Sequence, residues 1–221
     1  MSESMSLRAR KKLQVRDLLE NTALRMFDER GYQATTVEDI TAAVQFSERT
    51  FFRHFRSKED VVFANHTDNL ERLRRALDQQ PATEPATESA TESATESATE
   101  SVMKAVRHAI LNLQDFEHRR ELELARVRIV QATPALADRV YALQAEYEAV
   151  IASAIARSLG DDPDAWIKAV LLAGAAVAVM ALRADAQVAA APDDQSPTHA
   201  MHRAFDLLEQ AAHSLLHPPA P

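Results

Sequence analysis

The 221-residue chain contains no cysteine, three glycines and few aromatic residues, which make up 5% of it. Without cysteine, neither disulfide bonds nor thiolate metal sites can form. With so few glycines, the sharp turns that phosphate-binding loops and nucleophile elbows require are largely unavailable. We therefore expect the chain not to be an enzyme. We assign it no catalytic residue, no metal site and no cofactor.

Long hydrophobic runs are also missing. The longest nearly uncharged apolar run covers residues 169–182, which is 14 residues by count, whereas a membrane-spanning helix needs about 20. The N-terminus is polar and charged and lacks the apolar segment of a signal peptide. We expect a buried helix in a soluble protein without membrane association. The abundance of Ala, Leu, Glu and Arg predicts an all-α fold.

Residues 36–60 carry the most informative pattern in the chain. The segments that begin at Thr36 and Ser57 both read [ST]-x-x-[DE], a capping pattern that predicts a helix start at each place. Ser47 lies between them and is a third helix-starting residue. Starts this close together predict short helices packed at steep angles. Such an arrangement is typical of a helix-turn-helix, whose second helix enters the DNA major groove.

A longer segment, T-T-V-E-D-I-T-A-A-V-Q-F-S-E-R-T-F-F-R-H-F-R-S-K-E-D, follows a predicted first helix that ends D-E-R-G-Y. It resembles the N-terminal domain of the tetracycline-repressor (TetR) family of bacterial regulators. The resemblance covers about residues 11–63. The family usually places glycine in the turn, where this chain has Gln45. If Gln45 adopts a positive φ, its side chain adds a steric cost that glycine avoids.

The resemblance implies how this domain would contact DNA. Thr36 and Lys58, at two helix starts, would bind phosphates. Arg49, Thr50 and Phe52 would face base edges or sugars. The full set of expected DNA contacts is Thr36, Glu38, Ser47, Glu48, Arg49, Thr50, Phe52, Arg53, His54 and Lys58, with His54 on the DNA backbone and the two glutamates accepting from cytosine or repelling phosphate.

Charge is distributed unevenly along the chain. The net charge is −8, but residues 1–75 contain 14 Lys and Arg against 12 Asp and Glu, and the remainder contains 11 against 21. The basic residues Arg8, Arg10, Lys11 and Lys12 suit an arm or helix end that meets DNA phosphates. The alternative is a solvated N-terminus that contacts nothing. The acidic remainder would help to confine nucleic acid to one face.

Helical signals continue to the end of the chain. A first helix is expected at about 11–30, ended by Gly31, and a fourth at about 58–80. The predicted domains are a helix-turn-helix DNA-binding domain at 1–63 with its motif at about 36–55, a connecting helix at 64–80, a linker at 81–101, and a helical ligand-binding and dimerisation domain at 102–217.

The predicted linker consists of A-T-E-S repeats. As a helix, it would stack glutamates four residues apart, and like charges at this spacing repel. It also has no large apolar residue whose burial would offset the entropy lost on ordering. We therefore expect it to be disordered. Beyond it, the segment L-A-R-V-R-I-V-Q-A-T-P-A-L-A-D-R resembles the C-terminal domain of TetR-family members related to mycofactocin-type regulators.

An effector site is expected in this C-terminal part. Arg126 and Arg128 alternate within an otherwise apolar helix, so an inward guanidinium could hold a carboxylate or phosphate of an effector. Alternatively, both reach solvent or pair with Glu121 or Glu123. The candidate effector-binding residues are His108, Phe116, Arg126, Arg128, Tyr147 and Trp166.

Two subunits are expected to pair through the last two helices, about 163–189 and 197–217, because the family builds its dimer there. The alternative is that both helices only complete the core of the monomer. The small and apolar residues expected at the interface are Ala169, Ala173, Ala176, Ala204, Leu208, Ala211 and Leu215.

Together these features favour a homodimeric transcriptional regulator of the bacterial cytoplasm, associated with the nucleoid. It would recognise an inverted-repeat operator in double-stranded DNA. The resemblance implies a repressor that a small-molecule effector releases from its operator. An activator or an effector-independent regulator is an alternative of the same class. In another class, the chain would be a helical interaction protein in which Gln45 has impaired operator binding.

Overall fold

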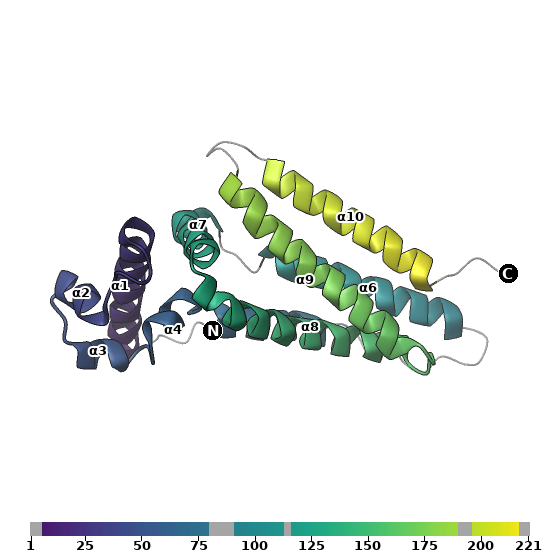
Figure 1. Ribbon diagram of the computed structural model, residues 1–221. Coiled ribbons are helices and arrows are strands. Elements are labelled where there is room, and N and C mark those ends of the chain that lie inside the picture. Colours follow the sequence, from purple (N-terminus) through teal and green to yellow (C-terminus); the bar gives the residue numbers. More distant parts are fainter. Residues whose placement is uncertain (1–5, 80–90, 113–115, 190–195, 217–221) are drawn as a thin grey trace. The chain divides into compact units, whose positions relative to one another are not determined.

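A computed structural model describes residues 6–79, 91–112, 116–189 and 196–216, and all regular structure in these ranges is helical (Figure 1). The expected all-α fold is confirmed. The elements are α1 (Leu7–Arg30), α2 (Val37–Ala43), α3 (Glu48–Phe52), α4 (Lys58–Val62), α5 (His66–Asp78), α6 (Thr91–Asn112), α7 (Phe116–Ala132), the 3-10 turn η1 (Pro134–Leu136), α8 (Ala137–Leu159), α9 (Ala165–Ala189) and α10 (Ser196–Leu216).

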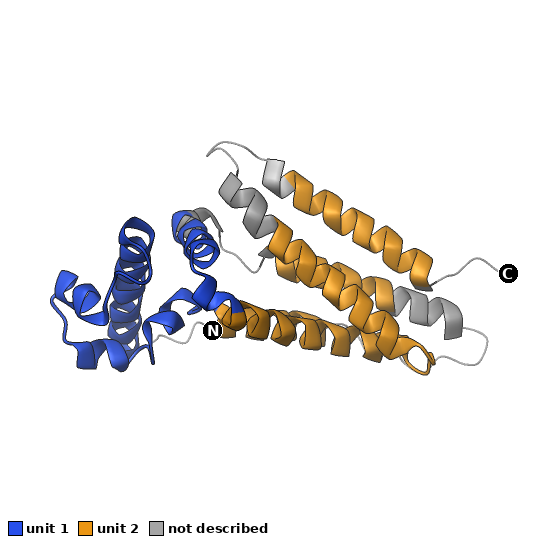
Figure 2. Cartoon of the chain, viewed as in Figure 1, with its two compact units in different colours: residues 1–65, 116–137 blue, residues 66–115, 138–221 orange. Residues whose placement is uncertain are grey.

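The chain forms two compact units (Figure 2). Unit 1 comprises residues 1–65 and 116–137, and unit 2 comprises residues 66–115 and 138–221. This division differs from the expected domains, because α7 belongs to unit 1 and not to the C-terminal domain. The physical reason is shared burial: Ile129 of α7 lies in the same hydrophobic core as Phe27 of α1.

Local capping explains the ends of α1. Ser6 accepts a hydrogen bond from the Ala9 amide, which starts the helix before the expected residue 11. Gly31, with a φ of 91°, ends it as predicted. The buried side chains of α1, including Leu19, Leu24 and Phe27, then supply most of its contribution to the core of unit 1.

The expected helix at 58–80 is two helices, α4 and α5, separated by residues 63–65. Side chains from elsewhere in unit 1 hold the carbonyls at the end of α4. Arg126 donates to the oxygens of Val61 and Val62 at 2.7 and 2.5 Å, and Arg16 donates to that of Ala64 at 3.1 Å. Because these donors satisfy carbonyls at a helix end, the chain can turn there without leaving them unpaired.

The expectation of a disordered repeat is wrong for its second half, because residues 91–101 form the first turns of α6. The first half lies outside the described residues. Thr99 is fully buried, and its hydroxyl lies 3.2 Å from that of Ser158. Val102 and Val106 follow in the core of unit 2. Extending a helix that this burial already stabilises costs less than starting one, so the repulsion between glutamates does not prevent it.

Most of helix α9 is apolar, and Lys168 is the only charged residue between Ala165 and Leu182. By length and composition alone, Ala165–Leu182 could cross a membrane, and only a third of this window is buried inside the protein. This helix, which was expected to be buried, is therefore buried on only one face. Four expected interface residues, Ala169, Ala173, Ala176 and Leu208, lie in the core of unit 2 and cannot form a subunit interface from there. Of the other three, Ala211 is exposed and Ala204 and Leu215 are half-buried.

Candidate nucleic-acid interface

The start of α2 is fixed by a capping box. The hydroxyl of Thr36 accepts from the Asp39 amide at 3.1 Å, and the Asp39 carboxylate accepts from the Thr36 amide at 2.8 Å. The hydrogen bonds from Thr36 lower the pKa of the Asp39 carboxyl. Thr36 and Glu38 are both exposed at this helix end, which agrees with the face expected to meet DNA.

The turn between α2 and α3 contains Gln45 with a φ of 55°. The condition under which the Gln45 side chain adds a steric cost is therefore met. The Gln45 amide donates to Ala42 at 3.2 Å, and the Phe46 amide donates to Thr41 at 2.9 Å. These hydrogen bonds hold Gln45 in the left-handed conformation that favours glycine. The Gln45 side chain raises the conformational energy of the turn, but the helix-turn-helix still forms.

Helix α3 begins at Ser47, whose hydroxyl accepts from the Thr50 amide at 3.2 Å. Phe51 and Phe55 face inward and are buried, with ring centroids 5.4 Å apart. The rest of α3 is consequently turned to the surface. Phe52 is 51% exposed, an unusual position for a phenylalanine that has no core to fill.

Basic groups flank this exposed phenylalanine. Arg49 and Arg53 are exposed, and within the described part of the chain neither forms an ion pair. Glu48 is also exposed, and Thr50 is half-buried. An exposed aromatic ring between two available guanidinium groups can stack on sugars or bases and hydrogen-bond to phosphates or base edges.

The N-terminal basic residues Arg8, Arg10, Lys11 and Lys12 are all exposed on the first turns of α1. The charges of Lys12 and Arg16, on this helix, act on the ring of His54 together with that of Arg53. Burial and these three cations lower the pKa of His54. Unit 1 therefore gathers positive charge from both α1 and the end of α3.

His54 itself differs from the expected backbone contact. Its Nε2 atom is buried and has no hydrogen-bond partner among the described residues. A buried nitrogen cannot reach a DNA phosphate, so a contact through this atom is wrong for the described conformation. The expectation failed because the sequence does not reveal which edge of the ring faces inward.

Lys58 also differs from expectation. Its ammonium donates to the carbonyls of Tyr32 and Thr35 at 2.8 and 3.2 Å and lies 4.3 Å from the centre of the Tyr32 ring. Desolvation lowers its pKa. Lys58 is therefore a structural link between α4 and the loop after α1, and its ammonium is held by the protein and not by the phosphate that was expected.

The two arginines predicted to bind an effector have partners inside unit 1. Arg126 is buried, forms an ion pair with Glu20 and lies 3.4 Å from Glu123. Arg128 forms a two-point ion pair with Asp28, at 2.9 Å from Nε and 2.5 Å from Nη2. The alternative of pairing within the chain is therefore confirmed for Arg126, since Glu123 was one of its expected partners. Glu20 and Asp28 are partners that were not expected.

Three of the remaining effector candidates, His108, Tyr147 and Trp166, belong to unit 2. Tyr147 is buried against His66, with ring centroids 5.1 Å apart, and burial raises its pKa to about 12. His108 is exposed on α6 and Trp166 on α9. The side chain of Phe116 lies outside the described residues.

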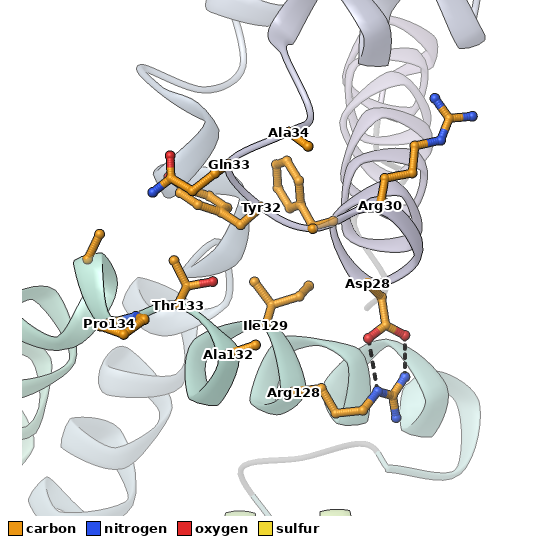
Figure 3. Close-up of a pocket in the computed structure, with 13 residues that line it drawn as sticks. Asp28, Arg30, Tyr32, Gln33, Ala34, Arg128, Ile129, Ala132, Thr133 and Pro134 are labelled. Carbon is orange, nitrogen blue, oxygen red and sulfur yellow. Dashed lines mark hydrogen bonds and ion pairs between the residues drawn. The ribbon is translucent and has the colours of Figure 1, made fainter.

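Sequence reasoning missed a pocket in unit 1, between the end of α1 and the end of α7 (Figure 3). It has a volume of about 550 Å³. Phe27, Tyr32 and Ile129 contribute apolar surface, and Arg128 lies on its wall. The two segments that line it are about a hundred residues apart in sequence. Of the expectations from the sequence, only an inward-facing Arg128 that binds an effector involves a residue of this pocket.

Comparison with known proteins agrees with this architecture. Residues 20–64 match the family model for bacterial regulatory proteins of the tetR family, and residues 100–213 match the model for the MftR C-terminal domain. The HTH-type transcriptional regulator TcmR from Streptomyces glaucescens is 36% identical over 161 residues. That alignment covers 72% of this chain and 66% of TcmR, just under two thirds of that relative.

Solved structures share the fold at low sequence identity. A protein described as a TetR-family transcriptional regulator from Syntrophomonas wolfei has a TM-score of 0.59 at 14% identity, covering 92% of this chain and 95% of its own. SmeT in complex with triclosan also has a TM-score of 0.59, at 18% identity, covering 94% of this chain and 99% of SmeT. From the two family matches, the chain belongs to the TetR family of bacterial regulatory proteins, with a C-terminal domain of the MftR type.

Proposed function

We propose that this protein is a sequence-specific DNA-binding transcriptional regulator that represses its target genes. The observation that carries the proposal is the outer side of α3, where Phe52 is exposed between Arg49 and Arg53. Exposed side chains of this kind add nothing to the hydrophobic core. In a helix that lies in the major groove, each of them can contact DNA. The protein acts in the bacterial cytoplasm, on the nucleoid.

Each part of the interface has a role in this proposal. Arg49, near the start of α3, contacts a base edge. Arg53 and the basic residues at the start of α1 bind phosphates, and this makes binding dependent on salt concentration. The proposed DNA contacts are Thr36, Glu38, Ser47, Glu48, Arg49, Thr50, Phe52 and Arg53, together with Arg8, Arg10, Lys11 and Lys12 of the N-terminal arm.

Two subunits pair through the outer face of α9 and α10, which we define as Ile167, Leu171, Ala178, Leu182, Leu207 and Ala211. Leu171 is 57% exposed and Leu207 is 61% exposed. Exposed apolar side chains that lie together on one face mark a protein–protein contact. The α9 members recur at helical spacing on the side opposite the buried alanines. A homodimer that buries this face holds two recognition helices, which then read an inverted repeat.

Release from the operator is caused by a small-molecule effector of unknown identity. SmeT, which shares this fold, is known in complex with triclosan. We infer that the present chain also binds a small molecule. We do not infer that it binds triclosan, because the sequence identity to SmeT is 18%.

Footprinting on the DNA upstream of its own gene tests the proposal. We expect the full-length dimer to protect an inverted repeat and to bind it at least about a thousandfold more tightly than random DNA. Equal affinity for both DNAs would contradict sequence-specific recognition. It would instead support the helical interaction protein considered as an alternative.

A further inference from the structure

The pocket between α1 and α7 has the properties of a ligand site. Its volume of about 550 Å³ lies inside the range typical of small-molecule sites, roughly 300–1,000 Å³. Phe27 and Ile129 form an apolar floor, and Tyr32 contributes an aromatic wall. All of its lining residues belong to unit 1, so a single compact unit defines its shape.

The charged groups at this pocket come from one ion pair. Arg128 contributes a guanidinium and Asp28 a carboxylate, whereas Figure 3 shows the side chain of Arg30 turned away from the pocket. Figure 3 shows Arg128 and Asp28 side by side, joined through two hydrogen bonds. These bonds use Nε and Nη2 of Arg128 and leave Nη1 outside the two-point pair. A ligand carboxylate can therefore take the place of the Asp28 carboxylate on Arg128, which a cationic group cannot do.

We propose that this pocket binds a small aromatic carboxylate. The ring system packs on Phe27, Tyr32 and Ile129, and the carboxylate accepts hydrogen bonds from Arg128 in competition with Asp28. Arginine suits this role because its planar guanidinium binds carboxylates through two parallel hydrogen bonds. The site lies in the DNA-binding unit.

Tyr32 gives such a ligand a route to the DNA-binding surface. The Tyr32 carbonyl and ring hold Lys58 at the start of α4. The loop that carries Tyr32 continues to Thr35, whose carbonyl also accepts from Lys58, and then to Thr36 at the start of α2. A ligand on Tyr32 therefore contacts the segment that leads into the helix-turn-helix.

Calorimetric titration of the full-length protein with 1-naphthoate, in the absence of DNA, tests the site. 1-Naphthamide, of the same shape but uncharged, is the matched probe. We expect the carboxylate to bind about tenfold more tightly than the amide, since charge-assisted hydrogen bonds are the stronger class. Equal binding of both probes, or no binding of either, would overturn the proposal. Because no DNA is present, this result is independent of operator recognition.

Two substitutions separate the carboxylate contact from simple burial. Arg128→Gln should weaken 1-naphthoate about tenfold and leave 1-naphthamide unchanged. Asp28→Asn removes the competing carboxylate and should strengthen 1-naphthoate several-fold, provided that circular dichroism shows native helicity. Weaker binding of 1-naphthoate by Asp28→Asn would contradict the assigned role of Arg128.

A pocket-filling variant locates the ligand. Ala132 lines the pocket and is exposed on α7, so Ala132→Trp should abolish binding of both probes. The matched control is Ala145→Trp, which changes an exposed alanine of α8 outside the pocket and should bind as the wild type does. Retained affinity in Ala132→Trp would place the binding site elsewhere.

Discussion

Arg126 of α7 and Glu20 of α1 form an ion pair in the interior of unit 1, where they are 7% and 2% exposed. The same guanidinium donates to the last carbonyls of α4. One side chain thus holds three helices of the DNA-binding unit together. A buried charge with several partners is costly to break, because removing one partner leaves the other uncompensated.

Arg126→Met should destabilise the protein by about 3–5 kcal/mol, because it removes the guanidinium that pairs with the buried carboxylate of Glu20. Adding Glu20→Gln should recover part of this loss. Urea unfolding of both single variants and the double variant gives the coupling free energy. Purely additive effects would mean that the two side chains do not stabilise each other.

Gln45→Gly should stabilise the protein by roughly 0.5 kcal/mol, since the relief of a positive φ exceeds the entropy cost of glycine. Operator affinity should stay the same. Gln79→Gly is the control, at an exposed position without a positive φ, and it should not stabilise. Thermal unfolding compares the two, and equal shifts would argue against strain at Gln45.

Arg49→Ala should weaken operator binding by about 1–3 kcal/mol and relax the preference for one base in each half-site. Arg25→Ala serves as control, because Arg25 is an exposed arginine of α1 that pairs with Glu29. Binding to a set of operators with single base changes measures the preference. Equal losses on operator and random DNA would show that Arg49 contacts only phosphate.

Stability should depend on His54 below neutral pH. Because the folded pKa of His54 is lowered, the unfolded chain binds the proton more readily. The contribution of neutral His54 to the free energy of unfolding is therefore fully present above the unfolded pKa of about 6.5. It is lost as the pH falls through the lower folded pKa. His54→Gln should flatten this part of the stability profile. The free energy of unfolding, measured with urea, is compared between pH 7 and 5. If it changes with pH in the variant as steeply as in the wild type, the prediction is contradicted.

Leu171→Asp combined with Leu207→Asp should convert the dimer into a helical monomer that loses operator affinity, because charges would face each other across the outer face of α9 and α10. Tyr141→Asp, at an exposed residue of α8, should remain dimeric. Sedimentation velocity distinguishes the two states. A dimeric double variant would place the interface elsewhere.

Features set by neighbouring residues were predictable from the sequence. The caps at Thr36, Ser47 and Ser57 form hydrogen bonds three residues along the chain, so their pattern is visible in the sequence itself. The same holds for the end of α1 at Gly31 and for the turn at Gln45, where backbone conformation limits the choice of residue.

Partners far apart in sequence were not predictable in this way. Lys58 and Arg126 were expected to face ligands, and both donate to backbone carbonyls within the protein. A basic side chain looks the same in a sequence whether it meets DNA, an effector or a helix end. The small residues of α9 were misassigned for a related reason. A stripe of alanines marks close packing but does not reveal which neighbour provides it.

The membership of α7 in unit 1 also determines when this unit can be completed during synthesis. Its first part ends at residue 65, and its second part, residues 116–137, leaves the ribosome only after more than fifty further residues. Until then, Glu20 has no Arg126 to neutralise it, and the carbonyls of α4 lack their donor. A gene fragment that stops after α4 or α5 therefore encodes an incomplete DNA-binding unit, and a chimera that exchanges recognition specificity must carry α7 with it.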